Sequence, residues 1–357
     1  MSSDIILGNT VSIFPERFAS PPWLPELAAP KAVAEPGLIA GFDAGQTHTS
    51  CRVSDACSGE MLGEGQGPGV CHLAAADGPA RFCQALQVSL AQARLHLPHT
   101  GTPLLAAGIG ASGIEVGSSV QELGRQLAAE ALQLPLERLV VTGDERTALR
   151  GAMGNQQGGA GILIISGTGT IAVGRNPAGQ EHRCSGWGWL LDGAGSATDI
   201  GRDGLALSLA MADGRQPDSP LRARIWAGLN VSADDPQAAQ AIKALVVEPG
   251  FGAAGFARLA PLVAAAASEG DAGAGAVVER SAQALALMAA TICTRLQLSA
   301  PPVWPMGGAL EHLAWLRRRL EACLEECCPG AQLQMPAADA CSGALSLARE
   351  CLEARPR

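Results

Sequence analysis

The segment ILIISGTGTIAVG, residues 162–174, restricts the fold of this chain more than any other stretch. Two short apolar runs flank the turn Gly167-Thr168-Gly169-Thr170, a pattern that predicts a β-hairpin. Glycines can adopt positive φ, which would let successive backbone N–H groups point into one concavity that suits an anion. The hydroxyls of Thr168 and Thr170 would add donors. An ordinary hairpin without a ligand explains the same pattern.

A second hairpin of this kind is predicted upstream, at residues 37–54. Residues 38–42 read as a buried strand, Asp43-Ala44-Gly45-Gln46-Thr47 as the turn, and residues 48–53 as the return strand. Asp43 would hold Mg²⁺ or its water shell, while the turn amides and Thr47 would hold phosphate oxygens. Alternatively, Asp43 simply initiates the turn. A pair of such hairpins favours phosphate binding over two unrelated turns.

Composition narrows the class of protein. A chain of 357 residues suggests two domains, and a net charge of −9 gives no reason to expect a nucleic-acid surface. No apolar run reaches the ~18 residues that span a bilayer, and the N-terminal MSSDIILGN has an acid where a secretory signal has basic residues. We therefore expect a cytoplasmic protein without a membrane partner. Its 11 cysteines are then expected to be thiols.

A P-loop is absent from the sequence. The only lysines are Lys31 and Lys243, and neither follows a glycine-rich loop, whereas a P-loop needs Gly-Lys-Ser/Thr. Backbone amides, hydroxyls, Mg²⁺ and arginines would have to bind any phosphate.

The order of predicted elements indicates an α/β fold. Residues 1–36 contain six prolines and are expected to form an irregular extension. A three-strand meander should follow and end at residue 62, with a loop at 63–69. Strands and helices then alternate, which implies a largely parallel sheet with ligands at the carboxyl ends of its strands. We expect domains at 37–150 and 151–339, with a C-terminal helix at 340–353 returning to the first.

Asp144 stands at one such strand end, in Gly143-Asp144-Glu145, between a strand at 139–142 and a helix from residue 146. A carboxylate there is a candidate general base. Capping of the helix N-terminus is an equally good interpretation, and one side chain can do both.

Two further segments suit ligand contact. Residues 184–196 form the densest glycine loop and contain Trp187; such loops often close over small polar ligands, although turns and core tryptophans give the same pattern. A strand at 303–306 runs into Gly307-Gly308, where the backbone can approach a flat ligand such as adenine. Most of the remaining chain is predicted helical, including single helices at 253–267 and 310–328.

In this order the motifs resemble the actin-like ATPase superfamily, which includes sugar kinases and Hsp70-type ATPases. Within it, the chain is most similar to the BadF/BadG/BcrA/BcrD ATPase family and its N-acetylglucosamine kinase and glucosamine kinase branch. The resemblance spans residues 38–348 and is carried by GFDAGQT, GASGIE, VTGDERTAL, ISGTGT, GWGWLLDGAGSATDIGRDGL, PMGGAL and DACSGALSLA.

The resemblance implies two ribonuclease-H-like domains around a cleft, with Mg²⁺-ATP between the hairpins and the sugar deeper. Asp144 would accept the proton of the sugar hydroxyl, by convention the 6-OH, and Asp43 would organise the metal. Homodimers are common in the resembled family, but no interface is evident in the sequence. The implied ATP contacts are Gly45, Gln46, Thr47, Gly167, Thr168, Gly169, Thr170, Gly307 and Gly308, and the implied sugar contacts are Ser112, Gly113, Gly186, Trp187 and Asp192.

The sequence departs from the family pattern on the sugar side. The usual Gly-Asp-Glu-Gly-Ser is here Asp192-Gly193-Ala194-Gly195-Ser196, so the acid lies one position earlier. In an extended backbone, a one-residue shift turns a side chain to the opposite side. The asparagine that usually follows the GPG turn is missing from Gly69-Val70-Cys71-His72. The resemblance therefore does not carry the identity of the sugar.

Two other functions stay open. Some family members are ATPases that activate acyl-CoA dehydratases or serve benzoyl-CoA reductases through an iron–sulphur cluster. The nearest thiol grouping here is Cys323, Cys327 and Cys328 on one predicted helix, which buried small hydrophobic side chains explain as well. A catalytically weak sensor that binds ATP or sugar is the other alternative.

Overall fold

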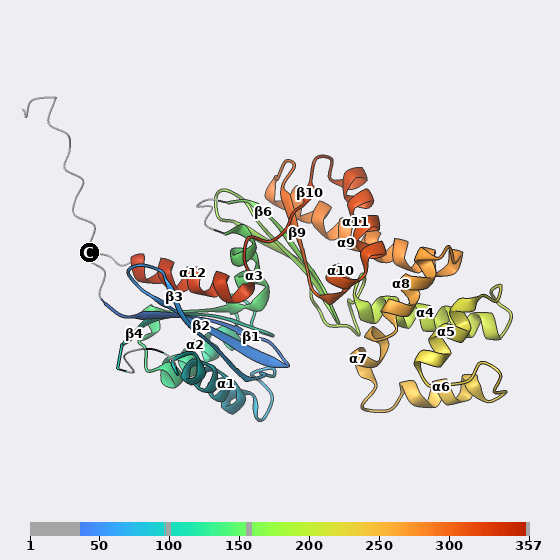
Figure 1. Cartoon of the computed structure of the whole chain (residues 1–357). Helices are drawn as coiled ribbons and strands as arrows, with labels where there is room; N and C mark the ends of the chain where they lie inside the picture. The colour runs from blue at the N-terminus through green and yellow to red at the C-terminus, as the bar shows by residue number, and fades with distance from the viewer. Residues whose placement is uncertain (1–35, 96, 98–100, 155–158, 355–357) are drawn as a thin grey trace, which may run out of the picture. The chain divides into compact units, whose positions relative to one another are not determined.

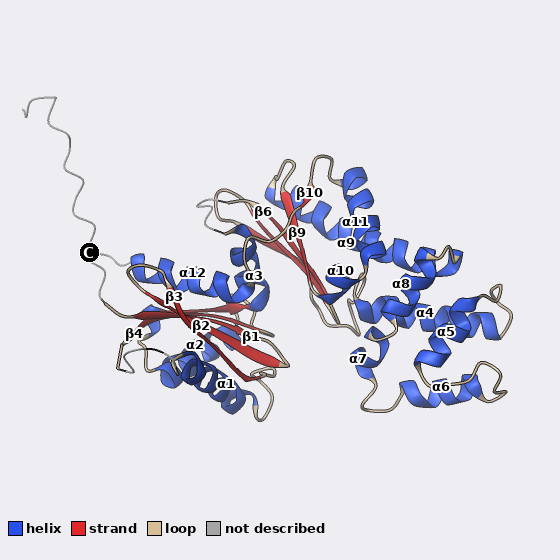
Figure 2. Ribbon diagram, in the orientation of Figure 1, coloured by secondary structure: helices blue, strands red, loops and turns tan. Residues whose placement is uncertain are grey.

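The described residues of the computed structural model, 36–95, 97, 101–154 and 159–354, form two five-stranded sheets with helices packed on them (Figure 1 and Figure 2). This confirms the predicted α/β fold. From Pro36 onward the chain clusters as one compact unit. The predicted irregular extension lies outside the described residues, apart from Pro36.

The first sheet has the strand order β3-β2-β1-β4-β5. β1 pairs antiparallel with β2 and parallel with β4, and β4 pairs parallel with β5. The carboxyl ends of β1, β4 and β5 therefore meet at one edge of the sheet. The strands are β1 Leu38–Ala44, β2 His48–Asp55, β3 Met61–Pro68, β4 Leu104–Ala111 and β5 Leu139–Gly143, and the helices packed beside them are α1 Gly78–Ala93 and α2 Ser119–Leu132.

The prediction of a loop at residues 63–69 is wrong, because Met61–Pro68 is the edge strand β3. Its alternate residues Gly63, Gly65 and Gly67 face α1. A Cβ on Gly63 would lie 2.1 Å from the carbonyl oxygen of Ala93, and one on Gly65 would lie 2.2 Å from that of Ser89. The three glycines therefore occupy every second position of β3, and the absence of side chains there lets the backbone of α1 lie directly on the strand.

The second sheet has the order β10-β9-β6-β7-β8. The predicted hairpin is confirmed, because β6 and β7 pair antiparallel from Gly161↔Arg175 to Ser166↔Thr170. β9 runs parallel to β6 with Met306 opposite Ile165, which brings Gly307 beside the hairpin turn. The strands are β6 Gly161–Ser166, β7 Thr170–Arg175, β8 Glu181–Ser185, β9 Pro302–Met306 and β10 Gln332–Leu333.

Two of the helices predicted after the hairpin are each divided in two. The helix expected at 253–267 is α7 and α8, because Pro261 has no N–H to continue the helix across the break. The helix expected at 310–328 breaks at Leu313, whose φ of −95° and ψ of 80° are not helical. The helices are α4 Ala197–Ala212, α5 Pro220–Gly228, α6 Ala238–Val246, α7 Gly252–Ala257, α8 Ala260–Ser268, α9 Ala272–Leu296, α10 Gly308–His312 and α11 Ala314–Cys327.

The longest helix, α9, is at the centre of the second core. It contacts β7, β8, α8 and α11, and its Val278, Ala282, Leu285, Ala289 and Ile292 are buried. Within the described residues α9 is also the one helix that is long and apolar enough to cross a membrane by length and composition. Its contacts explain that apolar composition, since a helix buried on several sides needs few polar residues.

The C-terminal helix α12 Ala340–Glu353 lies beside α3 Asp144–Met153 and packs on β1 and β4 (Figure 1). Glycines allow this close packing: a Cβ on Gly343 would lie 1.9 Å from the carbonyl oxygen of Thr147. Asp339 caps α12 by accepting from the amide of Ser342 at 3.0 Å. These contacts hold α3, and with it Asp144, against the first sheet.

Candidate active site

A cavity of about 670 Å³ brings residues of both sheets together. It lies at the carboxyl end of β4 and β5 and beside the turn between β6 and β7. Its size suits a small-molecule site. The lining includes these residues predicted for the site: Gln46, Ser112, Gly113, Asp144, Gly167, Thr168, Gly169, Thr170, Gly186, Trp187 and Asp192. Asp43, Gly45, Thr47, Gly307 and Gly308 are not among the residues that line it.

The turn after β1 offers fewer phosphate donors than expected. The amide of Gly45 donates to the carbonyl of His48 at 3.1 Å, and the hydroxyl of Thr47 lies 3.0 Å from Nδ1 of the same histidine. Gln46 does line the cavity, with its Nε2 3.4 Å from Oγ of Ser112. The hairpin therefore uses one predicted donor for its own closure and presents Gln46 to the cavity.

The turn between β6 and β7 is open to the cavity. Gly167 and Gly169 do not adopt the positive φ that the sequence suggested, and the amide of Gly167 donates to the carbonyl of Gly169 at 2.9 Å. A Cβ on Gly169 would meet no heavy atom within 4 Å, and one on Gly167 would come no nearer than 3.9 Å, to the amide nitrogen of Gly308. The protein itself does not require glycine here, so the open space suits a ligand that approaches the backbone.

Thr170 contributes differently from the prediction. Its hydroxyl is buried and donates to the carbonyls of Gly193 and Ala194, at 3.2 and 3.1 Å. Oγ of Ser166 donates to the carbonyl of Gly195 at 2.7 Å in the same way. These hydroxyls fasten the loop 193–195 to the hairpin, so the Thr170 hydroxyl is not a free phosphate donor.

Asp144 is the first residue of α3, and the N-cap is Gly143. The interpretation of Asp144 as the N-cap is therefore wrong. Burial raises the pKa of the Asp144 carboxyl, while hydrogen bonds from the backbone and side chain of Glu145 oppose that rise. Glu145 is itself buried, 3.3 Å from Nη1 of Arg146, and burial raises its pKa to about 7. Asp144 is thus a shielded carboxylate with an elevated proton affinity.

Asp43 lies within β1 rather than in the turn. Burial and then the negative charge of Asp144 raise its pKa to about 6, and His48 opposes the rise. Asp43 and Asp144 are thus two mutually repelling carboxylates, and their oxygens are a donor set that fits a divalent oxygen-seeking cation such as Mg²⁺.

The loop after β8 forms one wall of the cavity. Gly186 and Gly188 have φ of 85° and 91°, which favours glycine at both positions. Trp187 between them is 62% exposed, and the guanidinium of Arg183 lies 4.5 Å from the centre of its ring. Asp192 lines the cavity, and its amide donates to the carbonyl of Gly188 at 2.8 Å. The displaced acid therefore remains at the site.

Of the lining residues that the sequence prediction missed, four have ionisable side chains: His72, Glu115, Glu145 and Arg183. His72 was recognisable, because it belongs to the segment where the family asparagine is missing. Its ring packs on Gly113, where an added Cβ would come within 3.2 Å of Cδ2. Arg183 and Glu115 carry no local signal, since they meet only through the tertiary structure.

Gly307 lies outside the cavity lining but next to the hairpin. Its φ is 90°, and a Cβ there would lie 2.6 Å from the carbonyl oxygen of Ser166. Its amide donates to Oε1 of Glu311 at 3.0 Å. At Gly308, by contrast, an added Cβ would come no nearer than 3.7 Å to another heavy atom, Cδ2 of His312, so a flat ligand can approach the backbone there.

The cysteines are free thiols, and Cys323 and Cys328 are buried while Cys327 is exposed. Among the described residues no group of three or more His, Cys, Asp or Glu side chains is arranged to hold a metal ion. Burial raises the pKa of each of these three thiols to about 11, so they are ordinary protonated thiols at neutral pH.

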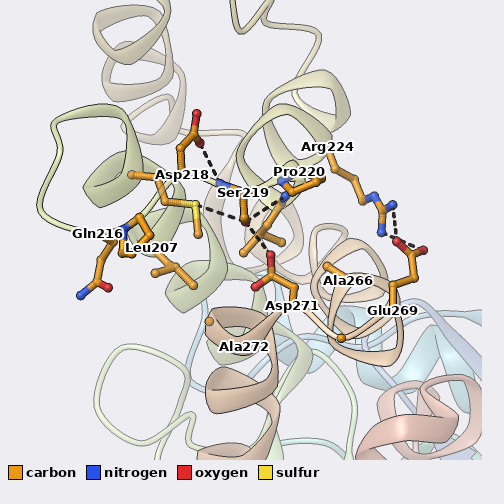
Figure 3. A pocket seen from close by; sticks show the side chains of 15 residues that line it. Leu207, Gln216, Asp218, Ser219, Pro220, Arg224, Ala266, Glu269, Asp271 and Ala272 are labelled. Carbon is orange, nitrogen blue, oxygen red and sulfur yellow. Dashed lines mark hydrogen bonds and ion pairs between the residues drawn. The ribbon is translucent and has the colours of Figure 1, made fainter.

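Another cavity, of about 500 Å³, lies among α4, α5, α8 and α9 (Figure 3). Four of its polar side chains are paired with one another: Arg224 bonds both carboxylate oxygens of Glu269, and Ser219 bonds Asp271 at 2.5 Å (Figure 3). This pairing leaves few groups to recognise a ligand, so the larger cavity is the better candidate.

Two five-stranded sheets with glycine-turn hairpins and a half-buried Asp at a strand end define an actin-like ATPase or sugar kinase fold. Solved structures agree. A candidate N-acetylglucosamine kinase from Chromobacterium violaceum matches with a TM-score of 0.63 and 29% identity, over 87% of this chain and 99% of the other. A ROK family glucokinase from Streptomyces griseus, in complex with glucose and AMPPNP, matches with a TM-score of 0.52 and 19% identity, over 88% and 100% of the two chains.

A model of the BadF/BadG/BcrA/BcrD ATPase family matches residues 40–348, and the chain belongs to this family. Membership implies the use of ATP. An N-acetylmuramic acid/N-acetylglucosamine kinase from Clostridium acetobutylicum is 33% identical over 106 residues, 30% of this chain and 32% of that protein. An N-acetyl-D-glucosamine kinase from Dictyostelium discoideum is 29% identical over 199 residues, 53% and 59% of the two. The matches thus span less than two thirds of these curated relatives.

Proposed function

We propose that this protein is a cytoplasmic kinase that transfers the γ-phosphoryl group of ATP to a hydroxyl of an amino sugar, N-acetylglucosamine or glucosamine. The 6-hydroxyl is the expected acceptor. The observation that carries the proposal is the half-buried Asp144 carboxylate, which shares one cavity with the open glycine turn at 167–169. A proton acceptor beside a phosphate-binding turn is what transfer to a hydroxyl needs.

Asp144 acts as the general base. Burial moves the pKa of Asp144 upward, toward neutral pH. A base with a pKa nearer to neutral pH accepts the hydroxyl proton more readily as the oxygen attacks phosphorus. The position at the start of α3 keeps this carboxylate on a rigid element. Such a base contributes on the order of 10²–10⁴-fold to the rate.

The phosphates lie along the turn between β6 and β7 and beside Gln46. The open faces of Gly167 and Gly169 admit phosphate oxygens close to the backbone. Asp43 would hold Mg²⁺. Asp144 lies close enough for its negative charge to raise the pKa of Asp43. When bound, Mg²⁺ neutralises charge that develops on the phosphoryl oxygens. Gly307 and Gly308 would lie against the adenosine.

The sugar lies against Ser112, Gly113, Gly186, Trp187 and Asp192. His72 belongs to the segment in which the family asparagine is missing, and its side chain lines the cavity, which makes it a candidate for a changed sugar contact. The names of the relatives and of the Chromobacterium violaceum structure support an amino sugar. A site whose polar groups pair with the hydroxyls of one sugar strongly disfavours sugars that leave these groups unpaired, so a narrow sugar preference is expected.

The deciding experiment is coupled ADP release from Mg²⁺-ATP with N-acetylglucosamine, glucosamine, N-acetylmuramic acid, glucose or no sugar. Release stimulated by one amino sugar supports the kinase and names its substrate. Release independent of sugar favours an ATPase of the activator kind instead. Sugar binding without any ADP release favours a binding-only sensor.

A further inference from the structure

A separate cavity of about 110 Å³ also borders the segment that carries Asp144. Thr142, two residues before Asp144, and Arg146, two residues after it, both line this cavity and not the larger one. β5, α3, β7, β8 and α12 contribute to the lining. Its residues are Val140, Thr142, Arg146, Leu149, Arg150, Met153, Arg175, Glu181 and Leu347.

The hydroxyl of Thr142 is an unsatisfied buried group in this lining. The residue is only 4% exposed, and its Oγ1 has no hydrogen-bond partner among the described residues. Leaving a buried hydroxyl without a partner costs free energy, and a bound ion or water is one way in which such a group is satisfied.

Arg175 is the second unsatisfied group. Its Nε is buried and, like the Thr142 hydroxyl, finds no partner in the part of the chain that the structure describes. Glu181 stands opposite Arg175 in the register of β7 and β8, but the carboxylate of Glu181 bonds Nε of Arg146 at 2.6 Å instead. No ion pair to Arg175 occurs among the described side chains.

The lining is therefore cationic. Three guanidinium groups and one carboxylate surround the cavity. Two of the guanidiniums have carboxylates of their own, since Arg146 also pairs with Glu145 at 3.3 Å and Arg150 pairs with Glu350 at 2.7 Å. Arg175 is left as the uncompensated charge, and it lies in the same lining as the unpartnered hydroxyl.

We propose that this cavity is a binding site for a phosphate-type tetrahedral oxyanion, distinct from the nucleotide site. Arg175 would donate through its guanidinium and Thr142 through its hydroxyl. A volume of about 110 Å³ holds such an anion easily, because one water needs only ~10–15 Å³ on the same measure. The same chemistry is available from inorganic phosphate or from the phosphoryl group of a sugar phosphate.

The site would connect parts of the chain that serve the proposed reaction. α3 carries Asp144, and β7 begins at the phosphate-binding turn. An anion held between Arg175 of β7 and Thr142 of β5 would tie these two elements together. The proposal does not depend on catalysis, because it rests on groups that line only the smaller cavity.

The test is thermal unfolding of the full chain with increasing inorganic phosphate, in the presence of saturating Mg²⁺ and AMPPNP so that the hairpin turn is occupied. We expect a concentration-dependent rise in Tm. Arg175→Gln should weaken the apparent phosphate affinity ~10-fold or more, as for a lost charge-assisted hydrogen bond, and Thr142→Val should weaken it ~5-fold. Arg215→Gln is the control, because that arginine is exposed and pairs only with Asp213.

Thr142→Val has a second readout. It removes an unsatisfied buried hydroxyl, so without phosphate its Tm should equal or exceed that of the wild type. If Arg175→Gln does not fold, Arg175→Lys replaces it in the test. Lysine keeps the charge, so this variant should bind phosphate with an affinity between those of the wild type and of a variant without the charge. An Arg175-dependent response to N-acetylglucosamine 6-phosphate at lower concentration than to phosphate would identify the sugar phosphate as the source.

Three results would overturn the proposal: no response of the wild type to either anion, the same response in Arg175→Gln and Thr142→Val as in the wild type, or loss of the response when AMPPNP is present. The last would assign the anion to the hairpin turn.

Discussion

Nη1 of Arg183 lies 2.7 Å from Oε1 of Glu115, which joins strand β8 to the loop after β4 across the wall of the larger cavity. The same guanidinium donates to the carbonyls of Ser185 and Gly186 at 3.1 and 3.2 Å and covers the ring of Trp187. The ion pair alone is worth little, because Glu115 is 54% exposed. Its importance lies in the several contacts that one planar group makes with the proposed sugar loop.

Arg183→Ala should therefore raise the KM for the sugar about 10-fold, with a smaller effect on kcat, because Trp187 and Gly186 lose their common support. Steady-state kinetics with the preferred sugar measures both constants. Arg224→Ala is the matched control, since Arg224 pairs with Glu269 in the cavity of Figure 3, away from the site. An unchanged KM in Arg183→Ala would show that the loop needs no such support.

Asp144→Asn should fold and bind ATP but lose on the order of 10²–10⁴-fold in phosphoryl transfer, because an amide cannot accept the hydroxyl proton. Coupled ADP release gives the rate, and thermal unfolding with AMPPNP checks folding and binding. Turnover near that of the wild type would rule out Asp144 as the base.

Asp43→Ala should shift the Mg²⁺ dependence of ADP release to higher metal concentration. The carboxylate proposed to hold the metal is lost, whereas the turn amides proposed to contact phosphate remain. A titration of Mg²⁺ at fixed ATP measures the shift. If wild type and variant respond identically, Asp43 has no part in metal binding.

The glycines of the chain divide into two classes that substitution can separate. Gly169→Ala should leave Tm unchanged, because the new Cβ meets no protein atom within 4 Å and φ is not positive, but it should weaken AMPPNP binding. Gly343→Ala should lower the free energy of unfolding by about 1–3 kcal/mol or more, because its Cβ would lie 1.9 Å from the carbonyl oxygen of Thr147. Nucleotide binding unaffected in Gly169→Ala would argue against the phosphate role of the turn.

Glu145 predicts a pH dependence of stability. Its pKa is raised from 4.5 to about 7 in the folded protein, mainly by burial, so folding favours the uncharged form. The stability linked to this group is fully present below pH ~4.5 and is lost as the pH rises through ~7. Glu145→Gln stays uncharged and can still accept from Arg146. It should match the wild type near pH 4 and exceed it by on the order of 3 kcal/mol at pH 8.

Urea unfolding at the two pH values measures this difference. Glu248→Gln, at an exposed glutamate, serves as the control. An equal advantage of Glu145→Gln at both pH values would contradict the assigned proton affinity.

Local patterns were sufficient for the hairpins. The apolar runs on both sides of residues 167–170 and 43–47 predicted strand, turn and strand, because alternation and turn chemistry act between neighbours in the chain. The same reasoning located Asp144 at a strand end. It failed for Gly63, Gly65 and Gly67, which read as a loop but form β3, because the close approach of α1 is a tertiary contact.

By itself, the sequence determined the α/β fold, the order of its motifs and the position of Asp144 at the end of a strand. Only the tertiary structure decided which donors face the cavity. The hydroxyl of Thr170 bonds the loop 193–195 instead of facing the cavity, while His72, Glu115 and Arg183 line it. The physical reason is that turn and strand preferences depend on residues close in sequence. Which hydroxyl or guanidinium remains free depends on acceptors that come from distant segments, such as Glu115 for Arg183 and Glu181 for Arg146.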